Sequence, residues 1–329
     1  AGYPIPPFPR GSAYRPRQTF PLASMPCAYD VCDASRSTPG SPASVKAWVV
    51  YACNVPLTLP NTEATIRAMQ ELDFVVAIDT MPAEVTGYAD VVLPENTYLE
   101  RFDDLEAPPF RVPYVAIRQP VVPSLYDSKP GWWIAKRLAE KLGVGSAFPW
   151  KDAEDYLRTR LETSQLSFEQ LRRDGVLLGK PAPIYDDAPR FKTPSGKIEL
   201  YSKTLADAGL PPLPPYEPPE EPPTGYFRLL FGRAPVHTFS RTTNNPRLAE
   251  VMPENELWLN AEMARSLGLR SGHLVMLENQ DGVKTGPIKL KATERLRQDC
   301  VFMVHGFGRE DRRLRRAFGR GASDARLIT

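Results

Sequence analysis

Hydrophobic and polar positions follow two patterns along the chain, and the change falls at a proline-rich stretch, residues 210–225. Before this stretch, short continuous apolar runs are separated by segments with helical periodicity. After it, β-branched or alternating runs are separated by Gly, Asn and Asp. The first pattern predicts an α/β unit with a parallel sheet, and the second predicts a small β-barrel with one short helix.

The α/β part opens with strand-length apolar runs at 46–53, 73–80 and 89–94. An amphipathic segment at 62–72, which Thr62 can cap, lies between the first two. Because strand, helix and strand follow one another, we expect a right-handed crossover and parallel strands. Ligands usually bind at the carboxyl ends of such strands. The loops expected at that edge contain Asn54, Asp79, Thr80 and Pro94.

Two further helical segments are predicted at 128–144, with Trp133 and Leu142 among its packed residues, and at 151–173. Residues 191–202 indicate a turn and a strand. The predicted domains are listed in chain order: an extended Pro/Ser-rich arm at 1–44, the α/β unit at 45–209, a stiff linker at 210–225, and the β-barrel at 226–329.

Composition narrows the possible partners. The chain has 41 Lys and Arg against 39 Asp and Glu, so overall charge gives no argument for a nucleic-acid partner. No apolar run has the roughly 20 residues of a membrane helix. The spacing of the four cysteines fits no zinc or cluster pattern. Cys27 and Cys32 are compatible with a disulfide or with two free thiols.

The densest group of candidate binding residues is GRAPVHTFSRTTNNP, 232–246, which follows an apolar strand. It combines arginines, hydroxyls and His237, and it suits a ligand rich in phosphate and amide groups. His237 is either a ligand-facing acid–base group or a structural histidine. The glycines after His305 allow close backbone approach to a loop or to a ligand. The basic run 309–320 either binds an anion or faces an acidic neighbour.

Four segments, in order, resemble the molybdopterin oxidoreductases of the dimethyl sulfoxide reductase family. These are 73–101 (DFVVAIDTMPAEVTGYADVVLPENTYLER), 130–143, 232–246 and 253–282. The resemblance extends over about residues 45–329. It implies that the α/β unit is an incomplete part of a discontinuous domain and that a six-stranded type of β-barrel follows it.

The resemblance also implies a cofactor: two molybdopterin guanine dinucleotides around one molybdenum or tungsten. Asp79 would accept hydrogen bonds from guanine, with Thr80 beside it and Asn54 and Pro94 in the same crevice. His237 would contact the pterin as a catalytic residue. The barrel residues implied to bind cofactor are Gly232, Arg233, Ala234, His237, Thr238, Phe239, Arg241, Phe307 and Ser323, the last standing where such barrels often have Asn.

The family's metal-ligating residue and iron–sulfur cysteines lie in an amino-terminal half that has no counterpart among these residues. We therefore expect this chain to be the carboxyl-terminal part of a longer oxidoreductase, or half of a split enzyme. It contributes no metal ligand in either case. A non-catalytic cofactor-binding subunit is the alternative.

The motif H-T-x-x-R-T-x-N-N-P, followed by P-E-N-x-L-W, is most similar to catalytic subunits of polysulfide and thiosulfate reductases. This likeness implies a small inorganic sulfur substrate, an iron–sulfur electron-transfer subunit, a membrane-anchor subunit and a periplasmic location. Arsenate, selenate or tetrathionate reduction and formate oxidation stay open as alternatives.

Overall fold

The computed structural model describes residue 22 and residues 27–181 and 191–329. Within these residues the chain forms two compact units, each built from separate segments. The smaller unit contains Phe102–Pro120, 149–181 and 191–222, and the larger unit contains residue 22, 27–101, Val121–Phe148 and Pro223–Thr329. The domain ranges expected from the sequence stay a prediction.

A three-stranded parallel sheet lies in the larger unit. Its strands β1 (Ala47–Tyr51), β2 (Phe74–Asp79) and β3 (Val91–Pro94) follow one another in space as they do in the chain. Each strand is a continuous apolar run, as expected for a sheet with helices on both faces. The register pairs Asp79 with Pro94, so the carboxyl ends of β2 and β3 meet at one edge.

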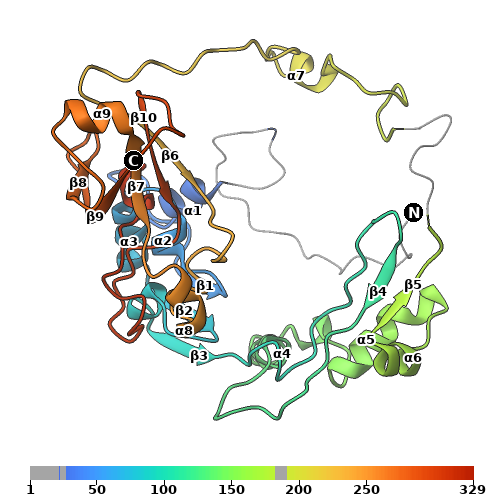
Figure 1. Ribbon diagram of the computed structural model, residues 1–329. Helices are drawn as coiled ribbons and strands as arrows, with labels where there is room; N and C mark the ends of the chain where they lie inside the picture. The colour runs from blue at the N-terminus through green and yellow to red at the C-terminus, as the bar shows by residue number, and fades with distance from the viewer. Residues whose placement is uncertain (1–21, 23–26, 182–190) are drawn as a thin grey trace. The chain divides into compact units, whose positions relative to one another are not determined.

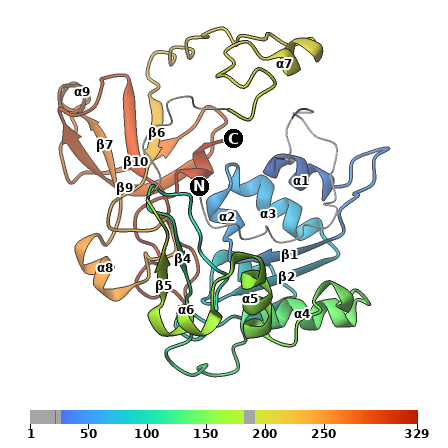
Figure 2. The ribbon, with the colours of Figure 1, turned by 90° about the vertical axis from the view of Figure 1, so that its right-hand side faces the viewer.

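Helices cover both faces of this sheet (Figure 2). One face packs against α3 (Thr62–Glu71) and η1 (Glu84–Gly87), and the other packs against α4 (Gly131–Lys141). The short helix α2 (Val55–Thr58) joins β1 to α3. The 3-10 turn η2 (Gly145–Ala147) follows α4.

Three local expectations about this region are wrong. Asn61, not Thr62, caps α3, because its side chain accepts a hydrogen bond from the Ala64 amide at 3.0 Å. Trp133 and Leu142 are 43% and 75% exposed rather than packed. Part of the expected extended arm forms helix α1 (Ala28–Ala34), and residues 1–21 and 23–26 of that arm lie outside the described residues.

The carboxyl-terminal part of the larger unit is a curled, mixed five-stranded sheet. Its order is β6 (Arg228–Gly232), β10 (Cys300–Val304), β7 (Glu256–Asn260), β9 (Lys284–Thr293) and β8 (Leu274–Glu278) (Figure 1). α8 (Pro246–Val251), α9 (Ala261–Ser266) and η4 (Ala325–Leu327) accompany it. The core of this barrel region is made by Leu257, Leu259, Ile288, Leu290 and Met303. The predicted fold class is confirmed, with five strands among the described residues where the resemblance implied a six-stranded type.

The smaller unit contains the antiparallel pair β4 (Tyr114–Ala116) and β5 (Val176–Leu178), with α5 (Ala153–Leu161), η3 (Glu162–Ser164), α6 (Phe168–Asp174) and α7 (Lys203–Asp207). Its core includes Leu105, Val115, Leu157 and Leu171. The strand expected within 191–202 is absent, and this segment forms turns and irregular backbone. None of the described helices has the length and apolar character needed to cross a membrane.

Candidate functional site

The carboxyl edge of the parallel sheet presents a carboxylate with spare hydrogen-bonding capacity. Asp79 ends β2, and its Oδ1 accepts from the Thr80 amide at 2.7 Å. Its Oδ2 has no partner in the described part of the chain. Each carboxylate oxygen can accept two hydrogen bonds. Thr80 and Pro94 are exposed beside it. Asp79 can therefore accept from two N–H groups of a ligand.

Asn54, in the same crevice, uses its amide within the chain. Its Nδ2 donates to Glu84 Oε2 at 2.6 Å, and its Oδ1 accepts from the Val85 amide at 3.2 Å. The side chain is buried at 9% exposure. Asn54 therefore ties the β1–α2 turn to η1, which leaves the backbone of this turn as the surface that a ligand can contact.

A buried ion pair joins the sheet to the barrel region. Arg309 Nε lies 2.9 Å from both carboxylate oxygens of Glu84, and its Nη1 donates to the Ser240 carbonyl at 2.8 Å. The two side chains are 5% and 10% exposed. Burial alone would raise the pKa of Glu84, but the hydrogen bonds and the charge of Arg309 outweigh it and hold this pKa below its ordinary value.

A second contact joins the barrel loop to the end of β1. Arg241 Nη2 donates to the Ala52 carbonyl at 3.2 Å. Burial raises the pKa of the neighbouring Cys53 thiol, the charge of Arg241 lowers it, and the charge of Asp79 raises it. The Ala52 amide donates to the Ile78 carbonyl at 2.9 Å, so Arg241 binds next to the strand end that carries Asp79.

The loop after β6 presents an arginine stacked on an aromatic ring. The Arg233 guanidinium lies 4.2 Å from the centroid of Phe239. Phe239 has φ +50°, a left-handed conformation that is uncommon outside glycine and clusters at functional sites. Ala234 is half-buried, and Thr238 is exposed with its amide donating to Thr242 Oγ1 at 2.9 Å.

His237 is held from both sides. Its Nε2 lies 2.8 Å from the Met252 carbonyl, which can only accept, so Nε2 carries the proton. Its Nδ1 then accepts from Thr242 Oγ1 at 3.2 Å. The ring is 6% exposed and packs edge-on against Phe307. This geometry gives His237 a structural role in the loop, and the catalytic role stays an untested prediction.

The glycines after His305 bring loops together. Gly306 has φ +97°, and a Cβ there would lie 2.6 Å from the Phe239 carbonyl carbon. A Cβ on Gly308 would lie 2.5 Å from the Ser323 amide nitrogen. Phe307 is 1% exposed, so its side chain is part of the core, and its contact with a cofactor stays a prediction.

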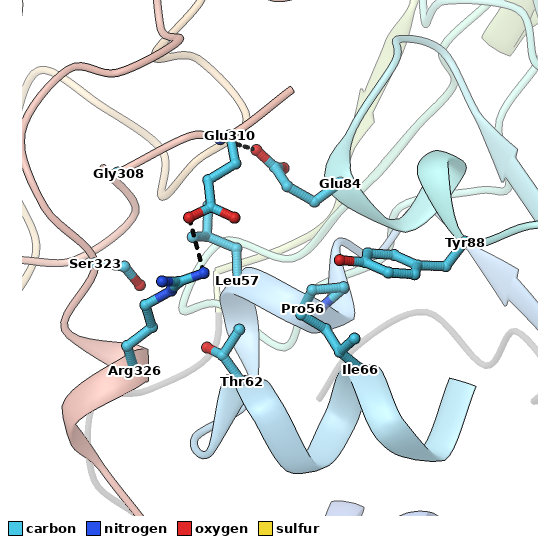
Figure 3. Close-up of a pocket in the computed structure, with 10 residues that line it drawn as sticks. All are labelled: Pro56, Leu57, Thr62, Ile66, Glu84, Tyr88, Gly308, Glu310, Ser323 and Arg326. Carbon is cyan, nitrogen blue, oxygen red and sulfur yellow. Dashed lines mark hydrogen bonds and ion pairs between the residues drawn. The ribbon is translucent and has the colours of Figure 1, made fainter. Parts of the chain in front are cut away.

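A small pocket lies between the start of α3 and residues 308–326 (Figure 3). Two buried hydroxyls among its lining residues, Thr62 Oγ1 and Ser323 Oγ, have no protein partner in the described residues. Arg326, also in the lining, pairs with Glu310 at 2.8 Å. An unsatisfied buried hydroxyl costs about 1–3 kcal/mol, so these two groups fit a polar ligand or a water molecule.

The basic run 309–320 divides into two kinds of residue. Arg309 is buried against Glu84, and Arg313 pairs with Asp311 at 2.6 Å. Arg312, Arg315, Arg316 and Arg320 are exposed.

All four cysteines are free thiols. Among the described residues, no group of three or more His, Cys, Asp or Glu could hold a metal ion.

Sequence reasoning missed Glu84 and Asp324, and it left Arg309 and His305 without a definite role. Glu84 stands in an ordinary Pro-Ala-Glu stretch with no local signal. His305 donates from Nδ1 to Asp324, 19 residues away, at 2.9–3.0 Å. The sequence signals near this pair were the glycines after His305 and the neighbouring Ser323.

Comparison with known proteins gives the family. Residues 33–141 match the molybdopterin oxidoreductase family, and residues 227–328 match the molydopterin dinucleotide binding domain. The thiosulfate reductase molybdopterin-containing subunit PhsA of Salmonella typhimurium is 31% identical over 296 residues, which cover 81% of this chain and 38% of the relative. The assimilatory nitrate reductase catalytic subunit of Bacillus subtilis is 29% identical over 79% of this chain and 37% of its own length.

A solved structure shares the fold. Acetylene hydratase from Pelobacter acetylenicus superposes with a TM-score of 0.76 at 24% identity, covering 93% of this chain and 43% of its own. The chain thus spans well under half the length of these relatives. Both matched segments carry predicted binding residues, Asp79 in the first and Arg241 in the second. The chain belongs to the molybdopterin oxidoreductase family.

Proposed function

We propose that this chain is the carboxyl-terminal, cofactor-binding part of a molybdenum or tungsten oxidoreductase that reduces the sulfur–sulfur bond of polysulfide or thiosulfate. The observation that carries the proposal is the 31% identity to a thiosulfate reductase subunit, which extends over 81% of the chain. A contact within the structure also supports the proposal. Arg241, in the second matched segment, bonds to the end of β1 in the first.

The residues of the site fit a pterin guanine dinucleotide. The free acceptor capacity of Asp79 matches the two N–H donors of a guanine edge. Arg233 and Arg241 are exposed, and their forked donors match a pyrophosphate. The unpartnered hydroxyl of Ser323 can bond a further polar group. When bound, a pair of such cofactors supplies a metal that passes two electrons to the substrate.

Analysis of the full-length protein from its native host tests the proposal. We expect molybdenum or tungsten by mass spectrometry, about two GMP per metal after acid hydrolysis, and oxidation of reduced methyl viologen by thiosulfate or polysulfide. An intact, folded protein with neither metal nor GMP would contradict the proposal and favour a cofactor-free subunit.

The relatives of this chain act on different substrates, so the substrate class is the part of the proposal that needs its own test. The F420-dependent formate dehydrogenase subunit alpha of Methanocaldococcus jannaschii is 30% identical over 80% of this chain, close to the value for the thiosulfate reductase subunit. Metal and GMP with formate oxidation, or with reduction of nitrate, arsenate, selenate or tetrathionate, would keep the cofactor assignment and replace the substrate.

We further propose that the whole protein works in the periplasm with an iron–sulfur electron-transfer subunit and a membrane-anchor subunit. The Salmonella relative is a molybdopterin-containing subunit, which supports an assembly. Co-purification from membranes under mild detergent would test it. A protein recovered alone from the cytoplasmic fraction of an unperturbed cell would contradict it.

A further inference from the structure

We propose that His305 and Asp324 form a proton-donating pair beside the candidate cofactor loops. The inference rests on the proposed function and adds a catalytic role to residues that the resemblance did not assign. Under this proposal His305 delivers a proton to the sulfur that leaves when the sulfur–sulfur bond breaks.

The geometry of the pair defines the tautomer. His305 follows β10, and Asp324 precedes η4. The Nδ1 atom lies 3.0 and 2.9 Å from the two carboxylate oxygens. An ionised carboxylate only accepts, so Nδ1 carries a proton and the neutral ring exposes Nε2 as an acceptor. The buried carboxylate also stabilises the imidazolium that forms when Nε2 binds a proton.

The open nitrogen distinguishes His305 from the other histidine of the site. Both nitrogens of His237 are engaged inside the protein. Nε2 of His305 has no partner in the described part of the chain, and its side chain is 14% exposed. The Asp324 side chain is 2% exposed. The buried Asp324 thus fixes the ring, and His305 Nε2 is the atom of the pair that a ligand can reach.

The pair lies among the predicted binding residues. The His305 amide donates to the Gly232 carbonyl at 2.9 Å, and its ring packs against Phe231 and Phe239 with centroid distances of 6.4 and 5.7 Å. Ser323 directly precedes Asp324. Two charged groups lie near this ring: Asp324, which bonds to it, and Arg233, whose guanidinium lies over Phe239.

The chemistry requires such a donor. Thiosulfate takes up two electrons and two protons as its sulfur–sulfur bond breaks, and the products are hydrosulfide and hydrogen sulfite. The two electrons come from a low-potential donor, which is reduced methyl viologen in the assay. One proton passes from His305 Nε2 to the departing sulfide sulfur, and solvent then reprotonates the ring.

The test uses the full-length protein with His305→Gln, which keeps an N–H for Asp324 but cannot carry a proton. We expect kcat to fall about 100-fold or more, KM to stay within about twofold, and metal and GMP contents to be unchanged. The pH profile of kcat should lose one limb. The midpoint potential of the metal, followed by electron paramagnetic resonance, should lose part of its pH dependence. His273→Gln, in the turn before β8, is the matched control and should behave as wild type.

Asp324→Asn is the second variant, and it keeps the shape of the pair while removing its charge. Because an amide can donate to Nδ1 as well as accept from it, the ring is no longer held in the tautomer that leaves Nε2 free, and kcat should fall by at least about tenfold. Wild-type kcat and pH profile in His305→Gln would overturn the proposal, as would loss of GMP from that variant, because the residue would then be structural or cofactor-binding. Absence of metal and GMP from the wild-type protein would instead overturn the proposed function.

Discussion

Asp79 and His237 are both polar residues that follow a strand, and the resemblance implies that both contact the cofactor. In the structure Asp79 keeps acceptor capacity for a ligand, whereas both ring nitrogens of His237 bond to the protein. The position of Asp79 depends on residues close to it in sequence, because the end of β2 and the turn that follows are enough to place it. The barrel loops are held by contacts between residues far apart in sequence, and these contacts occupy polar groups that a sequence motif presents as available.

The largest effect should come from breaking the buried pair that joins the two regions. Arg309→Ala leaves Glu84 as an uncompensated buried charge and should lower the free energy of unfolding by about 3–5 kcal/mol. Denaturant unfolding of the protein measures it. Arg312→Ala, exposed on the same loop, is the control and should change stability by less than about 0.5 kcal/mol. Equal effects of the two substitutions would show that the pair does not hold the regions together.

Acid should weaken the same junction. The folded-state pKa of Glu84 is lowered, so its contribution to stability is present above the unfolded pKa of about 4.3 and is lost as pH falls through the lower folded value. Stability curves measured between neutral pH and pH 3 should therefore be steeper for wild type than for Glu84→Gln. Parallel curves would mean that other carboxylates dominate acid unfolding.

An intermediate effect is expected at His237. His237→Ala leaves the Met252 carbonyl without its donor and the Thr242 hydroxyl hydrogen without its acceptor, and it should cost about 1–3 kcal/mol of stability. Thermal unfolding and kcat, measured together, separate the two roles of this residue. A large loss of kcat at unchanged stability would support the predicted catalytic role.

The smallest effect on stability should come from the sheet edge. Asp79→Asn should change the free energy of unfolding by less than about 0.5 kcal/mol, because the side chain is half-exposed and bonds only to its own turn. GMP content of the full-length protein should fall about tenfold, since an amide offers one acceptor and a mismatched donor to guanine. Glu262→Gln, exposed on α9, is a control that should keep GMP at the wild-type level.

Much of the fold follows from local pattern. Continuous apolar runs predicted all three parallel strands, and alternation with glycine turns predicted the strands of the barrel region. The predictions failed where burial or strand pairing depends on residues far away in the sequence. Trp133 and Leu142 have the right spacing to pack but are exposed, and 191–202 has strand-like residues without a pairing strand. Amphipathic spacing shows which residues share a face, not what covers that face.

The sequence by itself determined the parallel α/β unit, the barrel region, the family and the position of Asp79, because each depends on short-range periodicity or on a contiguous motif. Tertiary structure alone decided that Glu84 meets Arg309, 225 residues away, and that Asp324 fixes one nitrogen of His305. It also decided that His237 and Phe307 face inward. The physical reason is that a side chain's hydrogen-bonding capacity is a property of its residue type, whereas the partner that uses this capacity is chosen by chain folding.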